Sequence, residues 1–257
     1  MVRKFMNKKF SSVLKRSVCL GLCACMALGF TGCKKKNGSV KEKTVFSRDE
    51  IVGQHIFFGN YDQNNDPEDG KEAIEWIVLD QNGNKLLVIA NSILDVTNYS
   101  SAETSDWASS ELRTWLNDTF VKEAFSEDEQ KSLIETKVST PKNPVFEKET
   151  KKSKDTKDKV FIFSYAEAKK YFKENTDRVA SGTYTVTKKG LEEKKGSANH
   201  SLYWALRTPG NDMSKICVVD YDGKISDIGA YFGEGYLYGV RPVMWIDANA
   251  VKTTDAE

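Results

Sequence analysis

Two arginines share a similar setting, since each follows an apolar residue in a strand-like run and stands next to, or two residues from, a proline. Arg207 lies in SLYWALRTPG and Arg241 lies in YGVRPVMWI. A guanidinium bridges carbonyls or a carboxylate through paired hydrogen bonds, and a buried one must be paired. We therefore expect both arginines to brace neighbouring strands. The alternative is a ligand-binding site for a sugar or an acidic group, with Tyr203 and Trp204 beside these arginines.

Trp107 is a further candidate for ligand binding, because it follows the polar stretch YSSAETSD rather than an apolar run. An aromatic side chain in a loop serves either as a stacking platform for a sugar or as a plug that packs the loop onto the core. We favour the plug and keep the platform as the alternative.

The loop that follows the first strand-like run is rich in oxygen ligands. Asp62, Asn64, Asp66 and Asp69 fall within it, and calcium prefers six to eight such oxygens. The loop departs from the EF-hand pattern, because Pro67 stands where that pattern needs glycine. An acidic turn whose side chains bond their own backbone is the favoured interpretation, with calcium as the alternative and no other cofactor expected.

Residue types exclude several kinds of catalysis. The chain has two histidines, His55 and His200, and Cys217 is the one cysteine beyond position 33, so a Cys/His zinc site cannot be assembled. Cys217 lies in the alternating run KICVVDY, which favours a buried thiol over a nucleophile. Nucleotide-binding and hydrolase motifs are missing. A glycoside hydrolase with paired carboxylates remains possible, although no motif selects the pair.

The elements that must position these residues follow from periodicity and turn signals. Asn-Gly and Asp-Gly pairs between apolar runs predict two hairpins, whereas apolar spacing predicts a helix in SSELRTWLNDTFVKEAF. Capping boxes at Ser126 and Ser164 predict two more helices, the first continuing through Leu133 and Ile134. The expected strands are HIFFG, 74–80, 85–91, KVFIF, LYWALR, KICVVDY, KISDIGAY and YGVRPVMWI, and the lysine-rich stretches KETKKSKDTKDK and TKKGLEEKKGSAN are expected to be solvated, mobile loops.

The N-terminal segment has the layout of a secretory signal peptide. A basic stretch precedes the uncharged run SVCLGLCACMALGFTG, which is shorter than the roughly 20 residues of a spanning helix. The run ends at Cys33 in a sequence that resembles the bacterial lipobox, with Phe30 in place of the usual leucine. We predict a lipid on Cys33 and a location on the extracytoplasmic face of the cell membrane, because two acyl chains anchor a protein firmly.

The remaining composition bounds the folded part. The net charge is +1, so nucleic acid is not an expected partner. With Cys33 lipidated, Cys217 has no partner for an internal disulfide, and the fold must depend on burial. We expect a signal peptide over 1–32, a lipidated cysteine and flexible stalk over 33–44, one domain over 45–250 and a tail over 251–257.

Several stretches together are similar to an uncharacterised bacterial surface family, domain of unknown function 6273. They are FGNYDQ with EAIEWIVLD, the LRTWLNDTFVKEAFSEDEQ helix region, DTKDKVFIFSYAEAKKYF, YWALRTPG and YGVRPVMWI. The resemblance implies an exported protein and carries no known activity. The pair LRTPG and GVRPV also resembles, more distantly, the end of the C-type-lectin-like fold of formylglycine-generating-type domains, whose active members need a cysteine pair that this chain lacks.

We therefore expect a single compact α+β domain, C-type-lectin-like, with antiparallel hairpins and a few short helices. Its expected function is that of a membrane-anchored binding module for glycan or cell-wall polymer, with a cell-surface protein as the second kind of partner. The alternative is an extracytoplasmic hydrolase of the glycoside type.

Overall fold

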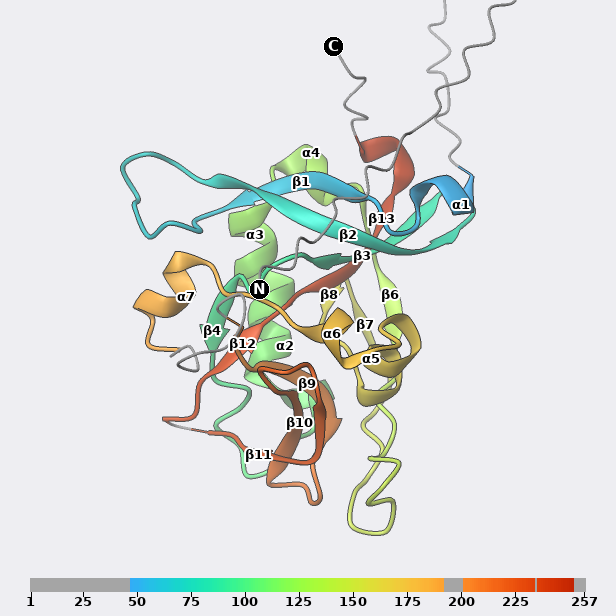
Figure 1. Ribbon diagram of the computed structural model, residues 1–257, viewed down its shortest axis with the longest axis vertical. Coiled ribbons are helices and arrows are strands. Elements are labelled where there is room, and N and C mark those ends of the chain that lie inside the picture. Colours follow the sequence, from blue (N-terminus) through green and yellow to red (C-terminus); the bar gives the residue numbers. More distant parts are fainter. Residues whose placement is uncertain (1–46, 192–200, 234, 252–257) are drawn as a thin grey trace, which may run out of the picture. The chain divides into compact units, whose positions relative to one another are not determined.

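One antiparallel sheet forms the larger layer of the fold. The structure is a computed structural model, and it describes residues 47–191, 201–233 and 235–251. The sheet has the strand order β1-β2-β3-β13-β5, and β8 also pairs with β13 (Figure 1). Its strands are β1 (His55–Tyr61), β2 (Glu72–Asn82), β3 (Lys85–Ala90), β5 (Leu133–Ile134), β8 (Val160–Phe161) and β13 (Val243–Asp247).

A second sheet contains Arg207 on one of its strands, and another of its strands ends just before Arg241. Its order is β11-β10-β9-β12-β4, and every pairing is antiparallel except β12 with β9, which is parallel through Gly239 and Trp204. Gly239 is required there, because a Cβ atom would stand 2.5 Å from the Tyr203 carbonyl oxygen. The strands are β4 (Asp95–Thr97), β9 (Trp204–Pro209), β10 (Lys215–Val219), β11 (Ile225–Tyr231) and β12 (Tyr238–Val240). A separate hairpin joins β6 (Thr136–Val138) to β7 (Thr156–Asp158).

The helices are short, and three of them run on from one another beside the larger sheet (Figure 1). These are α2, a π-helical turn η2 and α3, and Ser110 caps their start by accepting a hydrogen bond from the Arg113 amide. The helices are α1 (Arg48–Ile51), η1 (Trp107–Ser109), α2 (Glu111–Trp115), η2 (Leu116–Phe120), α3 (Val121–Ala124), α4 (Glu127–Gln130), α5 (Tyr165–Tyr171), α6 (Asn175–Arg178), α7 (Tyr184–Lys188) and η4 (Ala248–Ala250).

Aromatic side chains join this helical segment to the larger sheet. Trp76 is fully buried, donates from Nε1 to the Phe58 carbonyl oxygen over 2.7 Å and packs on Phe125 with ring centroids 6.4 Å apart. Phe58 also contacts Phe125, at 5.3 Å. Each such ring contributes about 1.5–3 kcal/mol when fully buried, so this cluster is a main source of stability.

The predicted α+β class with antiparallel hairpins and short helices is confirmed. Both capping boxes are present, and both predicted hairpins form, β2 with β3 and β10 with β11. The helix expected to continue through Leu133 and Ile134 was wrong. That helix ends at Gln130, because the apolar pair is needed as strand β5 against β13.

The lysine-rich stretch KETKKSKDTKDK is also a correction, because it does not form a wholly solvated loop. Thr150 and Ser153 are buried, and Asp158 at the end of β7 is 1% exposed. Most lysines of this stretch are exposed, whereas Thr150, Ser153, Thr156 and Asp158 between them are buried, a pattern that composition alone conceals. Of the second lysine-rich stretch, Thr187 and Lys188 belong to α7, and residues 192–200 lie outside the described part of the chain.

Candidate functional site

Arg207 is a brace between three segments. Its side chain is 1% exposed, and it donates from Nε to Thr140 Oγ1 (3.0 Å), from Nη2 to the Ser139 carbonyl oxygen (3.1 Å) and from Nη1 to the Ile162 carbonyl oxygen. It also forms an ion pair with Glu167 at 2.5 Å. The guanidinium therefore ties β9 to α5, to the segment that follows β6 and to the segment that follows β8, as the bracing interpretation predicted.

Arg241 is buried between two aromatic rings. Its guanidinium carbon lies 5.2 Å from the Phe172 ring centroid and 5.3 Å from that of Trp204, and Nε donates to the Ala90 carbonyl oxygen over 2.9 Å. Burial lowers the pKa of Arg241 to about 9. Trp204 is fully buried and donates to the Arg178 carbonyl oxygen. Both side chains face the core, where they hold β9, β12 and β3 together and present no surface to a ligand.

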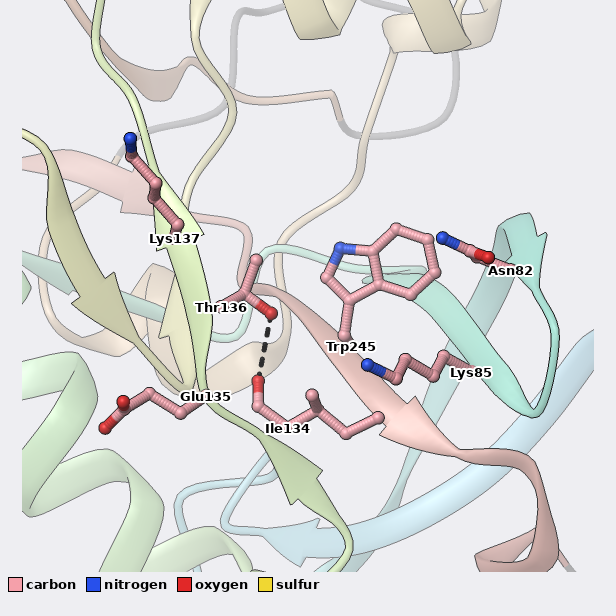
Figure 2. A pocket seen from close by; sticks show the side chains of 7 residues that line it. All are labelled: Asn82, Lys85, Ile134, Glu135, Thr136, Lys137 and Trp245. Carbon is pink, nitrogen blue, oxygen red and sulfur yellow. Dashed lines mark hydrogen bonds between the residues drawn. The ribbon is translucent and has the colours of Figure 1, made fainter.

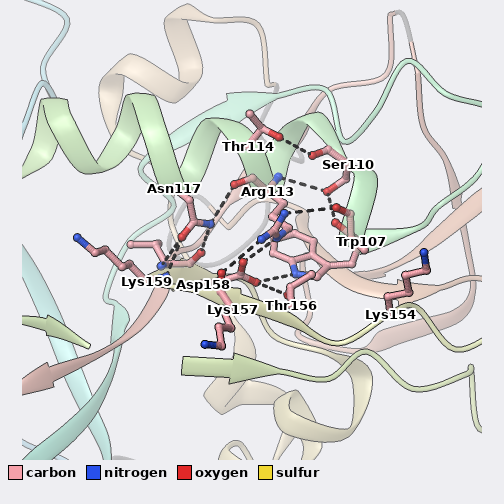
Figure 3. A network of polar contacts seen from close by, with 12 residues as sticks. Trp107, Ser110, Arg113, Thr114, Asn117, Lys154, Thr156, Lys157, Asp158 and Lys159 are labelled. Atoms are coloured by element: carbon pink, nitrogen blue, oxygen red, sulfur yellow. Dashed lines mark hydrogen bonds and ion pairs between the residues drawn. The ribbon is translucent and has the colours of Figure 1, made fainter. Parts of the chain in front are cut away.

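Trp107 also packs inward. The indole is fully buried, and Nε1 donates to Asp158 Oδ2 over 3.0 Å (Figure 3). The other carboxylate oxygen of Asp158 pairs with Arg113 Nε at 2.6 Å, and Thr156 donates its hydroxyl to the same carboxylate. The geometry is that of the plug, which fastens the loop before α2 to strand β7.

The acidic loop after β1 bonds largely to itself. The Asn65 amide donates to Asp62 Oδ1 over 2.7 Å, the Asp66 amide to Asn64 Oδ1 over 2.8 Å, and Asn64 Nδ2 to Asp69 Oδ2 over 2.9 Å. The first two are the bonds between side chain and backbone that are typical of an acidic turn, and the third joins two side chains of the same loop. Among the described residues, no group of three or more His, Cys, Asp or Glu side chains is placed to hold a metal ion. Calcium binding by this loop stays a prediction.

The cysteine is buried as its strand pattern indicated. Cys217 has no exposed surface, and burial raises the pKa of its thiol to about 12. A thiol in that state is a poor nucleophile, because the thiolate is the reactive form. His200 and Cys33 both lie outside the described residues.

The structure brings another tryptophan to the surface, in a pocket of about 330 Å³ (Figure 2). Trp245 on β13 is partly exposed, with Asn82 and Lys85 on one side and Ile134 and Thr136 on the other. Glu135 and Lys137 complete the lining. The volume falls at the low end of the roughly 300–1,000 Å³ that is usual for small-molecule sites.

Free hydrogen-bonding groups surround this indole. Three side-chain groups have no hydrogen-bond or ion-pair partner among the described residues. They are Trp245 Nε1, the side-chain amide of Asn82 and the ammonium group of Lys85. Lys137 is paired with Asp155 at 2.8 Å. The pocket thus combines one aromatic face with uncommitted polar groups, a combination suited to a ligand that has both an apolar face and hydroxyl groups.

The single carboxylate of the lining does not face the indole. In Figure 2 the Glu135 side chain extends away from Trp245, and its carboxylate lies 3.7 Å from Lys157 Nζ. Strand alternation explains this, because Glu135 lies between Ile134 and Thr136 and neighbouring residues in extended chain point to opposite sides. Among the charged lining residues, Lys85 is therefore the one without an ion-pair partner within the described residues.

The sequence patterns described above did not single out Trp245, and they gave no indication of this pocket. The run VMWID nevertheless contains the signal, because buried Met244 and Ile246 alternate with the partly exposed Trp245 and Asp247. In a strand with one buried face, a tryptophan on the same face as an aspartate is expected on the exposed face.

A second group of aromatic side chains lies along β11 and β12. Tyr231 and Tyr236 are about half exposed, their ring centroids lie 6.5 Å apart, and Lys215 Nζ stands 4.6 Å from the Tyr231 ring centroid. Tyr203, which is partly buried, contacts Tyr221 at 4.0 Å. Of the predicted ligand-binding residues, Tyr203 alone has an appreciable exposed surface, and its ring packs on Tyr221 rather than beside Trp107.

The fold and the pocket define a small α+β module with an aromatic-floored surface cleft. The chain belongs to the family described as Domain of unknown function (DUF6273), because that family's sequence model matches residues 82–248, more than half of the 257 residues. The matched range contains every lining residue of the Trp245 pocket, from Asn82 to Trp245. The stretches FGNYDQ and EAIEWIVLD precede it.

No curated protein and no solved structure matches the chain. In the part of the chain that the structure describes, we find no helix that combines the length and the apolar character needed to cross a membrane.

Proposed function

We propose that this protein is an extracytoplasmic lipoprotein whose domain binds glycan or cell-wall polymer in the Trp245 pocket. The observation that carries the proposal is the partly exposed indole of Trp245 beside the side-chain amide of Asn82 and the ammonium of Lys85, which are both unpaired within the described residues. A sugar ring offers an apolar face of C–H groups and a rim of hydroxyls. The first packs on an indole, and the second accepts and donates hydrogen bonds around it.

Binding is favoured over glycoside hydrolysis by the carboxylates of the pocket. Hydrolysis requires two carboxyl groups across the scissile bond, about 5–9.5 Å apart depending on the stereochemistry. The lining contains one carboxylate, Glu135, which is turned toward Lys157. We therefore assign the pocket a binding role, and keep hydrolysis as the alternative that the same experiment tests.

A glycan and cell-wall polymer screen of the full-length chain tests the proposal. We expect saturable binding that falls by at least tenfold in Trp245→Ala, because truncating a tryptophan at the centre of a binding site costs about 2 kcal/mol or more. Trp115→Ala is the matched control, since Trp115 is also partly buried and lies on α2 outside the pocket. Binding that is lost equally in both variants, or no ligand at all, contradicts the proposal, and release of sugar reducing ends instead supports the hydrolase.

The predicted anchor supports the cellular side of the proposal. The basic segment, the uncharged run and Cys33 form a lipoprotein signal in order. We expect the wild-type chain in the membrane fraction, with a diacylated Cys33 as its first residue by mass spectrometry. The Cys33→Ala variant should no longer be diacylated and should leave the membrane fraction. An unmodified Cys33 in membrane-bound protein would count against the lipid anchor.

We further propose that the domain is a C-type-lectin-like variant. Of the two arginine-containing segments that suggested it, LRTPG lies largely in β9 and GVRPV begins in β12. These strands pair through Trp204 and Gly239, and the Arg241 guanidinium lies over the Trp204 ring. An experimental structure of the chain, superposed on members of that fold, tests the assignment, and a different strand connectivity would reject it.

A further inference from the structure

A second pocket, of about 310 Å³, lies apart from the Trp245 pocket and is built from four separate segments. They are residues 104–106 before η1, Thr140 after β6, residues 151–154 of the lysine-rich stretch, and Pro209 with Met213 after β9. Two contacts hold these segments together. The Ser105 amide donates to the Met213 carbonyl oxygen over 2.7 Å, and the Ser153 amide donates to the Thr140 carbonyl oxygen over 3.1 Å.

Two buried hydroxyl groups in this lining have protons to give. Ser105 is 1% exposed, and its Oγ has no hydrogen-bond partner. Thr140 is also 1% exposed, and its Oγ1 accepts from Arg207 Nε over 3.0 Å but donates no hydrogen bond to another described residue. An unpartnered buried hydroxyl costs about 1–3 kcal/mol, so such a group in a pocket points to a ligand that supplies the missing acceptor.

The charge of the lining identifies the kind of acceptor. Lys151, Lys152 and Lys154 line the pocket, and Asp106 is its one acidic residue. Lys152 is paired with Asp155 at 3.0 Å, whereas within the described ranges Lys151 and Lys154 have no side-chain partner. The Asp106 carboxylate accepts from the Ser109 hydroxyl over 3.2 Å. That hydroxyl leaves the Asp106 charge in place, so within the described ranges the charges without an ion-pair partner around the hydroxyls are Lys151, Lys154 and Asp106, with a net charge of +1.

We propose that this second pocket binds a phosphoryl group. Ser105 and Thr140 donate their hydroxyl protons to its oxygens, and Lys151 and Lys154 balance its charge. A phosphoryl group offers several strong acceptor oxygens and one to two negative charges, which match the two hydroxyl donors and the net positive charge of the lining. Arg207 acts as a positioning residue, because its hydrogen bond occupies a lone pair of Thr140 Oγ1 and leaves the hydroxyl proton for the ligand.

Titration of the full-length chain with small anions tests the proposal. We would follow two-dimensional NMR spectra at constant ionic strength during addition of inorganic phosphate, dimethyl phosphate and acetate, up to about 10 mM, a range that detects millimolar affinities. We expect phosphate to bind and acetate to bind at least tenfold more weakly. Binding of dimethyl phosphate as well would show that the pocket accepts a phosphodiester of a polymer, and phosphate alone would indicate a monoester or the free ion.

Three variants make the test specific. Lys151→Gln with Lys154→Gln should weaken phosphate binding by at least tenfold, whereas Lys142→Gln with Lys148→Gln, which removes the same charge from exposed positions outside the lining, should not. Ser105→Ala should weaken binding and leave the thermal midpoint unchanged or raised, because the hydroxyl has no partner to lose.

Equal weakening in both lysine pairs would show a diffuse charge effect and overturn the proposal, as would equal affinity for acetate or no spectral change. The outcome is independent of the proposed glycan site, because Trp245 lies outside this lining and Trp245→Ala should bind phosphate normally.

Discussion

Replacing Arg207 by methionine should destabilise the protein strongly. Methionine keeps most of the length and removes the charge, so two carbonyl oxygens, at Ser139 and Ile162, lose their donor, and Glu167 loses its ion-pair partner. Each buried acceptor left without a partner costs about 1–3 kcal/mol. Glu167 is 31% exposed, so water compensates part of its loss. We expect the free energy of unfolding to fall by about 4 kcal/mol, within the range for breaking a buried pair.

Urea denaturation followed by tryptophan fluorescence and circular dichroism measures this change. With a slope of about 2 kcal/mol per molar urea, the midpoint should fall by about 2 M. Arg48→Met is the matched control, because Arg48 also pairs with a carboxylate, Asp80 at 2.6 Å, but is 60% exposed. We expect a loss of less than about 1 kcal/mol there. Similar losses in the two variants would refute the bracing role of Arg207.

The same ion pair should give a pH dependence. Burial alone would raise the pKa of Glu167, but the Arg207 charge and hydrogen bonds from Arg207 and Ser164 hold it below its ordinary value of 4.5. A carboxyl whose pKa is lowered by folding stabilises the protein above its unfolded pKa, and the contribution disappears as the pH falls through the folded value. The stability difference between wild type and Glu167→Gln should therefore be full at pH 7 and shrink below about pH 4.5. A difference that stays constant down to pH 3 would contradict this assignment.

Three further predictions concern buried groups. Trp107→Phe should lower the free energy of unfolding by about 1–3 kcal/mol, because Asp158 loses the indole donor. The same urea titration measures this, and an unchanged midpoint would show that water replaces the donor. Gly223→Ala should lower the thermal midpoint by several degrees, since Gly223 has φ +77° and an added Cβ meets the Asn175 carbonyl oxygen. Gly83→Ala is the control for backbone strain alone, because Gly83 also has positive φ but open space around the added Cβ. Cys217 should resist iodoacetamide at pH 8 in the native protein and react in urea, because burial raises the pKa of its thiol to about 12. Mass spectrometry of the Cys217 peptide follows the labelling, and fast labelling of the native protein would contradict that burial.

Local sequence patterns were sufficient for elements that depend on near neighbours. The hairpin turns at Gly83 and Gly223 and the caps at Ser126 and Ser164 form as predicted, because they depend on residues within a few positions of one another. The assignment of Leu133 and Ile134 to a helix failed, because their pairing partner is β13, far away in the chain.

The sequence by itself determined the residue types available for chemistry: one cysteine beyond position 33, two histidines, and no dedicated catalytic motif. It also predicted a lipoprotein signal and the α+β class, and the class was confirmed. Tertiary structure decided which of these side chains face solvent. Trp107 and Trp204 turned inward, whereas Trp245 faced a pocket, because exposure depends on which strands pack over a residue rather than on its own type.

Tertiary structure also decided the composition of both pockets. The Trp245 pocket joins residues from β2, β3, β5, β6 and β13, and the second pocket joins the loop before η1 to the lysine-rich stretch and the end of β9. Contacts between segments so far apart in the chain arise when the two sheets and the β6–β7 hairpin pack together. The sequence sets which groups exist, and long-range pairing sets which of them meet.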